Sequence, residues 1–411
     1  MVRKTVLDNG LKIVTEHFES VKSVSAGIWV KTGSRNESRS QSGVTHFLEH
    51  MLFKGTESRS SYDIAMSMES VGGYLNAFTS SEYTCYFSRC LSTQLDRALD
   101  VLSDMILHPS LPEEEIEKEK NVVVEEMKMY RDSPNDYLLE QFVGHAFKGH
   151  PLGQSTLGYE DTVSAFSRED LYAYMNGRYQ PSNLLVAVAG NVDHEEVVQL
   201  VSGFFDEKPS NELKELDQTL PAYQTGQLKL TKPIEQTHLV TGRRGLDYDH
   251  DDKYRLLLAN TVLGGGMSSR LHQNIREKYG YCYSITSFNQ SYKDTGLYGI
   301  YVGTDEQYVD HVRELIQKEL DKLKQEPIPE KELSEAKSQL KGKLLLSLES
   351  MSNRMSRLAK SEIYFNRFVT MDELIDKIDE VQADEIQEFA RDFYNSEMFS
   401  EAILTPENSE K

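Results

Sequence analysis

The chain has 411 residues, 38% of them hydrophobic and 27% charged, with a formal net charge of −21, so we expect a globular protein of two or more domains that repels, rather than binds, nucleic acid. No apolar run reaches the roughly 18 residues of a membrane span, and the first residues lack the apolar core of a signal peptide. The three cysteines form no CxxC pair, which favours a reducing compartment such as the cytoplasm.

The first half of the sequence alternates predicted strands and helices. A turn at residues 8–10 separates two short strands, and residues 24–34 form a buried strand that ends in a turn. Apolar residues at helical spacing predict a helix that ends at Gly55, and a glycine pair at residues 72–73 ends the next helix. The remaining elements are two strands, a helix, a longer helix, a buried strand and a last helix (74–90, 95–107, 111–134, 183–192 and 193–205).

The second half echoes the first. Residues 206–227 are polar, contain two prolines and show no period, which is typical of a linker. Beyond them, segments that begin at residues 275, 328 and 392 resemble earlier ones in the same order, and this predicts a duplicated domain of roughly 200 residues. We therefore expect an α+β protein with two homologous domains, each an antiparallel-rich sheet with helices packed on it (1–205 and 228–411).

The stretch "VTHFLEHMLFKG" places two histidines and a glutamate within five residues. Positions i and i+4 of a helix share one face, so His46 and His50 could bind the same ion, with Glu49 beside them. Zinc favours nitrogen ligands in a tetrahedral shell, and a catalytic site keeps one position for water, so a third protein ligand is needed. On this pattern alone, a helix with two partly exposed histidines stays an alternative.

The His-x-x-Glu-His pattern is the inverted zinc motif of the inverzincins. Its surroundings, "GVTHFLEHMLFKG", resemble the M16 (pitrilysin-like) metallopeptidases, which include insulin-degrading enzyme and mitochondrial processing peptidase. The family's spacing implies that Glu126 is the third ligand of one zinc ion per chain. A further family glutamate, two helical turns earlier and on the same helix face, is matched by Glu119. The chain length is similar to that of small bacterial members.

Two other segments are similar to the family. In the second half, "GGGMSSRLHQNIREKYGYCYSI" resembles a glycine-rich segment followed by an Arg–Tyr pair, here Arg276 and Tyr283. Taken alone, this pair would be a surface charge and a core aromatic. "GGYLNAFTSSEYTCYF" looks like the edge strand that pairs with the substrate backbone, although alone it would be an ordinary hairpin. The resemblance implies substrate contacts at Asn76, Ala77, Phe78 and Thr79.

The second copy is not expected to bind metal. Lys343 stands where the first copy has Glu126, and no second His-x-x-Glu-His follows residue 50. The resemblance implies that the two domains form a clamshell around a chamber. It also implies that Arg276 and Tyr283 contact the substrate carbonyls, with Tyr283 stabilising the oxyanion.

These expectations combine into a zinc-dependent endopeptidase that cleaves peptides or unfolded segments enclosed between two domains. Glu49 would act as the general base, and Glu119 would orient a ligand. In this size class the resemblance also suggests a homodimer. Two alternatives stay open: a catalytically idle relative that serves as a structural or peptide-recognition subunit, and a different zinc hydrolase on a similar scaffold.

Overall fold

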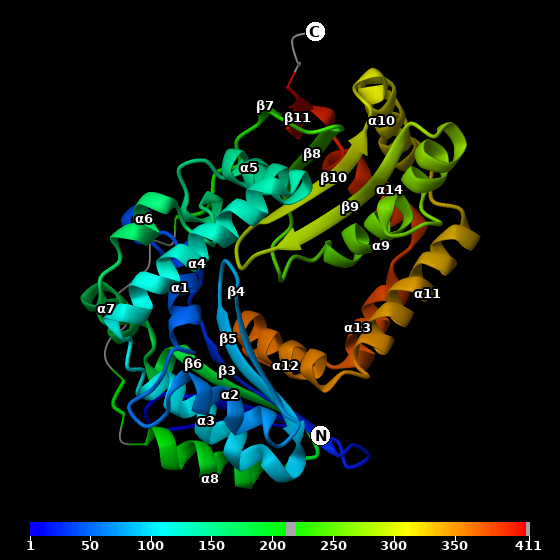
Figure 1. The fold of residues 1–411 in the computed structure, drawn as a ribbon. Helices are drawn as coiled ribbons and strands as arrows, with labels where there is room; N and C mark the ends of the chain where they lie inside the picture. Colours follow the sequence, from blue (N-terminus) through cyan, green and yellow to red (C-terminus); the bar gives the residue numbers. More distant parts are fainter. Residues whose placement is uncertain (207, 211–218, 408–411) are drawn as a thin grey trace. The chain divides into compact units, whose positions relative to one another are not determined.

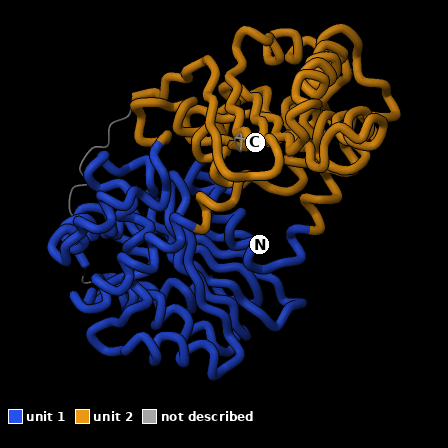
Figure 2. The backbone as a smooth tube through the Cα atoms, turned by 45° about the horizontal axis from the view of Figure 1, so that its top comes forward, with its two compact units in different colours: residues 1–128, 154–218, 347–368 blue, residues 129–153, 219–346, 369–411 orange. Residues whose placement is uncertain are grey.

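The computed structural model describes residues 1–206, 208–210 and 219–407, which form two compact units (Figures 1 and 2). Within these residues, unit 1 draws on the stretches 1–128, 154–218 and 347–368, and unit 2 on the stretches 129–153, 219–346 and 369–411. Each unit is therefore assembled from three separate stretches of the chain, and each contains one sheet.

The sheet of unit 1 has the strand order β1-β2-β6-β3-β5-β4. All neighbouring strands are antiparallel except β2 and β6, which run parallel. Among the residues that the structure describes, β4 therefore has a strand partner on one side only. The strands are β1 (Val2–Val6), β2 (Lys12–His17), β3 (Ser23–Val30), β4 (Tyr74–Thr79), β5 (Thr84–Leu91) and β6 (Leu184–Gly190).

Helices cover both faces of this sheet. Along β6, Leu184 and Val186 point into a core shared with the helices of the first half of the chain. Leu185 and Ala187 point to the opposite face, where they pack with residues of α12. Alternate residues of a strand face opposite ways, so β6 is apolar throughout because both of its faces are buried. The helices are α1 (Val44–Met51), α2 (Ser61–Glu69), α3 (Leu95–Leu107), α4 (Glu113–Asp132), α6 (Glu160–Ala165), α7 (Arg168–Arg178), α8 (His194–Phe205) and α12 (Met351–Phe365).

The sheet of unit 2 has the order β7-β11-β8-β10-β9, with β7 and β11 parallel and the other neighbours antiparallel. One face packs against α9, α10 and α14, and α5 packs against β8 and β11. The elements are β7 (Gly226–Lys232), β8 (Thr237–Gly245), β9 (Cys282–Ser291), β10 (Gly296–Thr304), β11 (Ser400–Pro406), α5 (Pro134–Ala146), α9 (Lys253–Gly264), α10 (Val309–Gln325), α11 (Glu330–Ser347), α13 (Met371–Glu380) and α14 (Ala383–Phe393).

Short helical turns join these elements. One of them, η6 (His272–Glu277), is a π-helical turn. The others are 3₁₀ turns: η1 (Ser34–Asn36), η2 (Arg39–Gln41), η3 (Ser92–Gln94), η4 (Pro151–Gly153), η5 (Pro181–Asn183), η7 (Glu306–Tyr308) and η8 (Ser396–Met398).

The expected α+β class with two sheets is confirmed. The compact units nevertheless depart from the expected contiguous division into 1–205 and 228–411, because α5 belongs to unit 2 and α12 to unit 1. The apolar face of an amphipathic helix can cover whichever sheet lies next to it, and a sequence pattern does not say which. Of the expected linker 206–227, residues 207 and 211–218 lie outside the described residues, and Gly226 already begins β7.

Candidate metal centre

The first turn of α1 is fixed by a carboxylate from outside the helix. The N-cap residue Gly43 has a positive φ of 93°, and a Cβ there would lie 2.6 Å from the carbonyl oxygen of Leu157. Glu37 accepts hydrogen bonds from the backbone N–H groups of Gly43 (2.7 Å) and Thr45 (2.8 Å). These donors lack partners inside the helix, and the two oxygens of Glu37 supply acceptors for them. Glu37 thus anchors the helix that carries the histidines.

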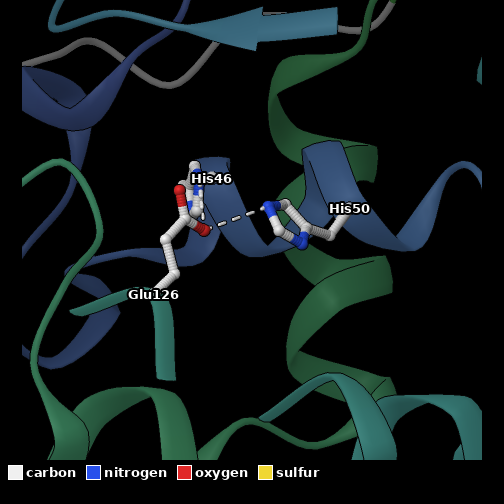
Figure 3. A group of neighbouring side chains, drawn as sticks. All are labelled: His46, His50 and Glu126. Carbon is white, nitrogen blue, oxygen red and sulfur yellow. Dashed lines mark ion pairs between the residues drawn. The ribbon is translucent and has the colours of Figure 1, made fainter. Parts of the chain in front are cut away.

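Three side chains converge beside α1 (Figure 3). The donor atoms of His46, His50 and Glu126 all lie within 4.8 Å of one another. Oε2 of Glu126, on α4, is 3.7 Å from Nε2 of His46 and 3.6 Å from Nε2 of His50. A tetrahedral zinc ion with bonds of about 2.0–2.1 Å would place its ligand atoms about 3.4 Å apart. Two imidazole nitrogens and one carboxylate oxygen at these separations therefore fit zinc.

The two histidines have different proton affinities. Burial, and then the neighbouring His50, lower the pKa of His46 to about 3, so its ring is neutral. Burial also disfavours the charged form of His50, but the hydrogen bond and the charge of Glu119 outweigh burial and raise its pKa. His46 therefore offers a lone pair at neutral pH, whereas a metal ion has to compete with a proton more strongly at His50.

Glu119 joins His50 to a lysine that the sequence reasoning missed. Oε1 of Glu119 lies 2.8 Å from Nδ1 of His50, and Oε2 accepts a hydrogen bond from Nζ of Lys54 at 2.6 Å. Burial alone would raise the pKa of Glu119, but His50 and Lys54 lower it overall. An ionised Glu119 that holds Nδ1 leaves Nε2 of His50 free for a metal ion. The only signal for Lys54 in the sequence was its place just after the motif.

Glu49 lies beside the cluster and bonds to the edge strand. Its Oε2 accepts a hydrogen bond of 2.5 Å from the hydroxyl of Thr79 on β4. Burial raises the pKa of Glu49, and the bond from Thr79 offsets part of this rise. A carboxylate with a raised pKa is suited to accept a proton and release it again near neutral pH.

Within the part of the chain that the structure describes, no strand pairs with the second edge of β4. At the end of the β4–β5 hairpin, the N–H of Ser80 donates to the carbonyl of Tyr83 (2.9 Å). Hydrogen-bonded and non-hydrogen-bonded pairs alternate along an antiparallel ladder, so the backbone groups of Thr79 and Ala77 point away from β5. The N–H of Ala77 meets the side-chain oxygen of Asn76 at 2.9 Å. β4 thus presents backbone donors and acceptors along an open edge.

The side chains of residues 76–79, predicted to contact substrate, alternate between the two faces of the sheet. Ala77 is buried in the core shared with α1, and Thr79 points to the same side. Phe78 packs edge-on against Trp29 on the opposite face of the sheet, at 5.6 Å between ring centres. Asn76, also on that face, donates a hydrogen bond to the hydroxyl of Tyr74 (2.6 Å).

Arg276 and Tyr283 lie together in unit 2. Nη1 of Arg276, in the π-helical turn η6, is 2.7 Å from Nε2 of the buried His272. The guanidinium lies 5.6 Å from the centre of the Tyr283 ring, whose residue is 76% exposed on β9. Tyr283 is therefore no core aromatic, and the sequence reasoning missed His272. The π-helical form is rare in proteins, and where it occurs it often lies at a functional site.

Two family models match most of the chain. "Insulinase (Peptidase family M16)" matches residues 12–160, and "Peptidase M16 inactive domain" matches residues 165–340. The "Uncharacterized zinc protease YmxG" of Bacillus subtilis is 40% identical over 406 residues, which are 99% of this chain and 98% of that one. The chain belongs to the M16 peptidase family.

Further proteins are similar over nearly the whole chain. An uncharacterized zinc protease of Streptomyces coelicolor is 38% identical over 405 residues, or 95% of this chain and 87% of that one. Among solved structures, a protease from Helicobacter pylori has a TM-score of 0.93 at 24% identity and covers 99% of both chains. A "peptidase M16 inactive domain" from Pseudomonas fluorescens has a TM-score of 0.91 at 19% identity, covering 100% of this chain and 99% of that one. These structures establish the fold.

The two M16 models divide the candidate residues. The first contains His46, His50 and Glu126, and the second contains Arg276 and Tyr283. Among the residues that the structure describes, the first three form the one group of at least three His, Cys, Asp or Glu side chains with converging donor atoms. None of the described helices combines the length and the apolar character that crossing a membrane requires.

Proposed function

We propose that this M16 protein is a zinc-dependent endopeptidase that cleaves peptides or unfolded segments. The observation that carries the proposal is the convergence of His46, His50 and Glu126 with Glu49 beside them. The donor set and its spacing fit one zinc ion per chain. The names of the relatives, zinc proteases, support the same chemistry.

Each nearby side chain has a separate task in this proposal. Zinc, when bound, supplies the Lewis acidity that makes water a stronger nucleophile near neutral pH. Glu49 accepts the proton that water loses on attacking the peptide carbonyl, and later gives it to the leaving amine. Glu119 orients the ring of His50, and Lys54 keeps Glu119 ionised.

The substrate backbone would pair with β4. An extended peptide can add a strand to an open sheet edge, with affinity from main-chain hydrogen bonds. The carbonyl of Ala77 and the backbone groups of Thr79 face outward for this pairing, and an incoming strand would take the place of the Asn76 side chain at the N–H of Ala77. We assign Arg276 and Tyr283 to the substrate carbonyls, as the family resemblance implies, with the exposed hydroxyl of Tyr283 as an oxyanion donor.

The test combines metal analysis with a peptide digest. We expect one zinc ion per chain by elemental analysis, and cleavage of a peptide library, read by mass spectrometry, that a chelator abolishes. Full zinc occupancy with no cleavage would instead support the idle, recognition-subunit alternative. Cleavage of another bond type with peptides left intact would support a different zinc hydrolase. The homodimer and the cytoplasmic location stay predictions, open to light scattering and cell fractionation.

A further inference from the structure

Thr79 is in contact with the proposed base and is also part of the proposed peptide-binding edge. Its side chain donates a hydrogen bond to Oε2 of Glu49. Its backbone groups point toward the side of β4 away from β5, because Ser80 forms the hydrogen-bonded pair with Tyr83 that sets the alternation. One residue therefore contacts Glu49 through its hydroxyl and offers backbone groups to an incoming strand.

The position of Thr79 is fixed by its surroundings. It pairs with Thr84 at the last register position of the β4–β5 hairpin, and the buried hydroxyl of Thr84 donates to the carbonyl of Thr32 (3.1 Å). The turn beyond is held by a backbone bond from Ser34 to Ser80 (3.2 Å). A Cβ at Gly33 would lie only 2.2 Å from the carbonyl oxygen of Ser80. The hydroxyl of Thr79 thus projects from a frame with little room to shift.

Glu49 has few other contacts that could hold it. Among the described residues, the hydroxyl of Thr79 is the one hydrogen-bond donor to its carboxylate. A glutamate has several rotatable bonds, and a misplacement of about 1 Å in a catalytic group can cost about 10²-fold in rate. Without Thr79, the carboxylate would leave the geometry in which it can take the proton from water.

We propose that Thr79 is a positioning residue that aligns the base Glu49 with a peptide bound along β4. This inference rests on the proposed peptidase function and deepens it. Strand pairing fixes the backbone of Thr79 against the peptide, and the hydroxyl then fixes the carboxylate against the same peptide. Binding of an extended substrate and alignment of the base are thereby coupled through one side chain.

The test compares Thr79→Val, which removes the hydroxyl and keeps the shape, with Thr79→Ser, which keeps the hydroxyl. The probe is a quenched fluorescent peptide that the wild-type chain cleaves. We expect Thr79→Val to lower kcat by about 10–100-fold, with KM within about twofold and zinc content unchanged. Thr79→Ser should restore most of kcat. Thr15→Val is the matched control, since it removes a buried threonine hydroxyl on β2, where Thr15 contacts His194, and should affect stability rather than kcat.

Several outcomes would overturn the proposal. Full kcat in Thr79→Val, or a Thr79→Ser variant as slow as Thr79→Val, removes the role of the hydroxyl. If Thr79→Val does not fold, Thr79→Ala takes its place. Loss of zinc from a folded Thr79 variant would mean that Thr79 supports the metal site instead. Glu49→Gln distinguishes failure of the proposed function from failure of the role of Thr79. An active Glu49→Gln variant would refute the proposed function. An inactive Glu49→Gln variant together with a fully active Thr79→Val variant would refute only the role of Thr79.

Discussion

Units 1 and 2 share elements but differ in the side chains that those elements carry. Among the described strands, β4 ends the sheet of unit 1 and β9 ends the sheet of unit 2, each with a strand partner on one side. The long helices α4 and α11 correspond in the duplicated sequence, yet Glu126 on α4 faces two histidines, whereas Nζ of Lys343 on α11 donates to the carbonyl of Gly265 at 2.8 Å. A few substitutions on a common framework thus decide which unit can hold a metal ion.

Each unit also contains a helix from the half of the chain that forms most of the other unit. The sheet of unit 1 is covered on one face by α12 from the second half of the chain, and the sheet of unit 2 packs against α5 from the first half. The fully buried Trp29 lies in the cluster that α12 covers. A fragment that ends near residue 220 would expose this cluster to water, so the contribution of each unit is best tested with point variants of the whole chain.

The largest expected effect is loss of the metal. His50→Ala leaves two ligands, which cannot hold zinc well, so we expect elemental analysis to find little zinc and the peptide assay to find no cleavage. Lys343→Glu, the matching change in unit 2, adds a carboxylate where no histidine pair exists and should leave the count at one. Two tightly bound zinc ions in the wild-type chain would contradict the contrast between the units.

Glu49→Gln is expected to keep zinc and lose turnover by about 10²–10⁴-fold or more. Glutamine has nearly the size of glutamate but cannot accept the proton from water. Glu125→Gln is the control, because Glu125 is an exposed neighbour of Glu126 that pairs only with Lys128 among the described residues. Substantial peptide cleavage by fully metallated Glu49→Gln protein would rule out the base.

Tyr283→Phe tests what unit 2 contributes. Loss of one oxyanion donor typically costs about 10²–10³-fold in kcat, and the removed hydroxyl belongs to an exposed side chain, so folding and zinc content should not change. Arg276→Ala should weaken peptide binding as well, because a charged hydrogen-bond donor is lost. If both variants cleave the quenched peptide at the wild-type rate, these two side chains of unit 2 do not take part in catalysis.

The sequence predicted the residues of the candidate metal site better than it predicted which helices pack on which sheet. The i, i+4 spacing in a helix and the family's spacing together placed His46, His50 and Glu126, and the structure brings their donor atoms together. The helix at 95–107 was predicted with the bounds of α3. Glu37 and His272 were missed because a carboxylate that caps a helix six residues away, or a histidine that contacts an arginine, has no signal in local periodicity.

Leu358→Ala tests the exchanged helix α12. Leu358 is 2% exposed and packs among the side chains on the face of β6 away from α1. Removing a buried leucine side chain costs about 3 kcal/mol, from lost burial and the cavity left behind. Urea unfolding should show this loss, and Leu138→Ala on α5 is the matching change in unit 2. If added zinc raises the free energy of unfolding of the two variants by the same small amount, metal binding does not stabilise unit 1 more than unit 2.

A pH-dependent effect is expected from the carboxyl group that supports α1 in unit 1. Burial raises the pKa of Glu37 from its ordinary value of 4.5 to about 8, although the N–H groups of Thr45 and Gly43 oppose this rise. The folded chain therefore binds a proton that the unfolded chain releases between these two values. The stability that Glu37 contributes is complete below pH 4.5 and is lost as the pH rises through 8, by about 1.4 kcal/mol per pH unit between them. In Glu37→Gln this slope should disappear from urea unfolding curves measured between pH 5 and 8. Glu125→Gln, an exposed change in the same unit, should leave the slope as it is. A wild-type chain whose stability does not fall over this range would show that the two helix N–H groups keep Glu37 ionised in spite of its burial.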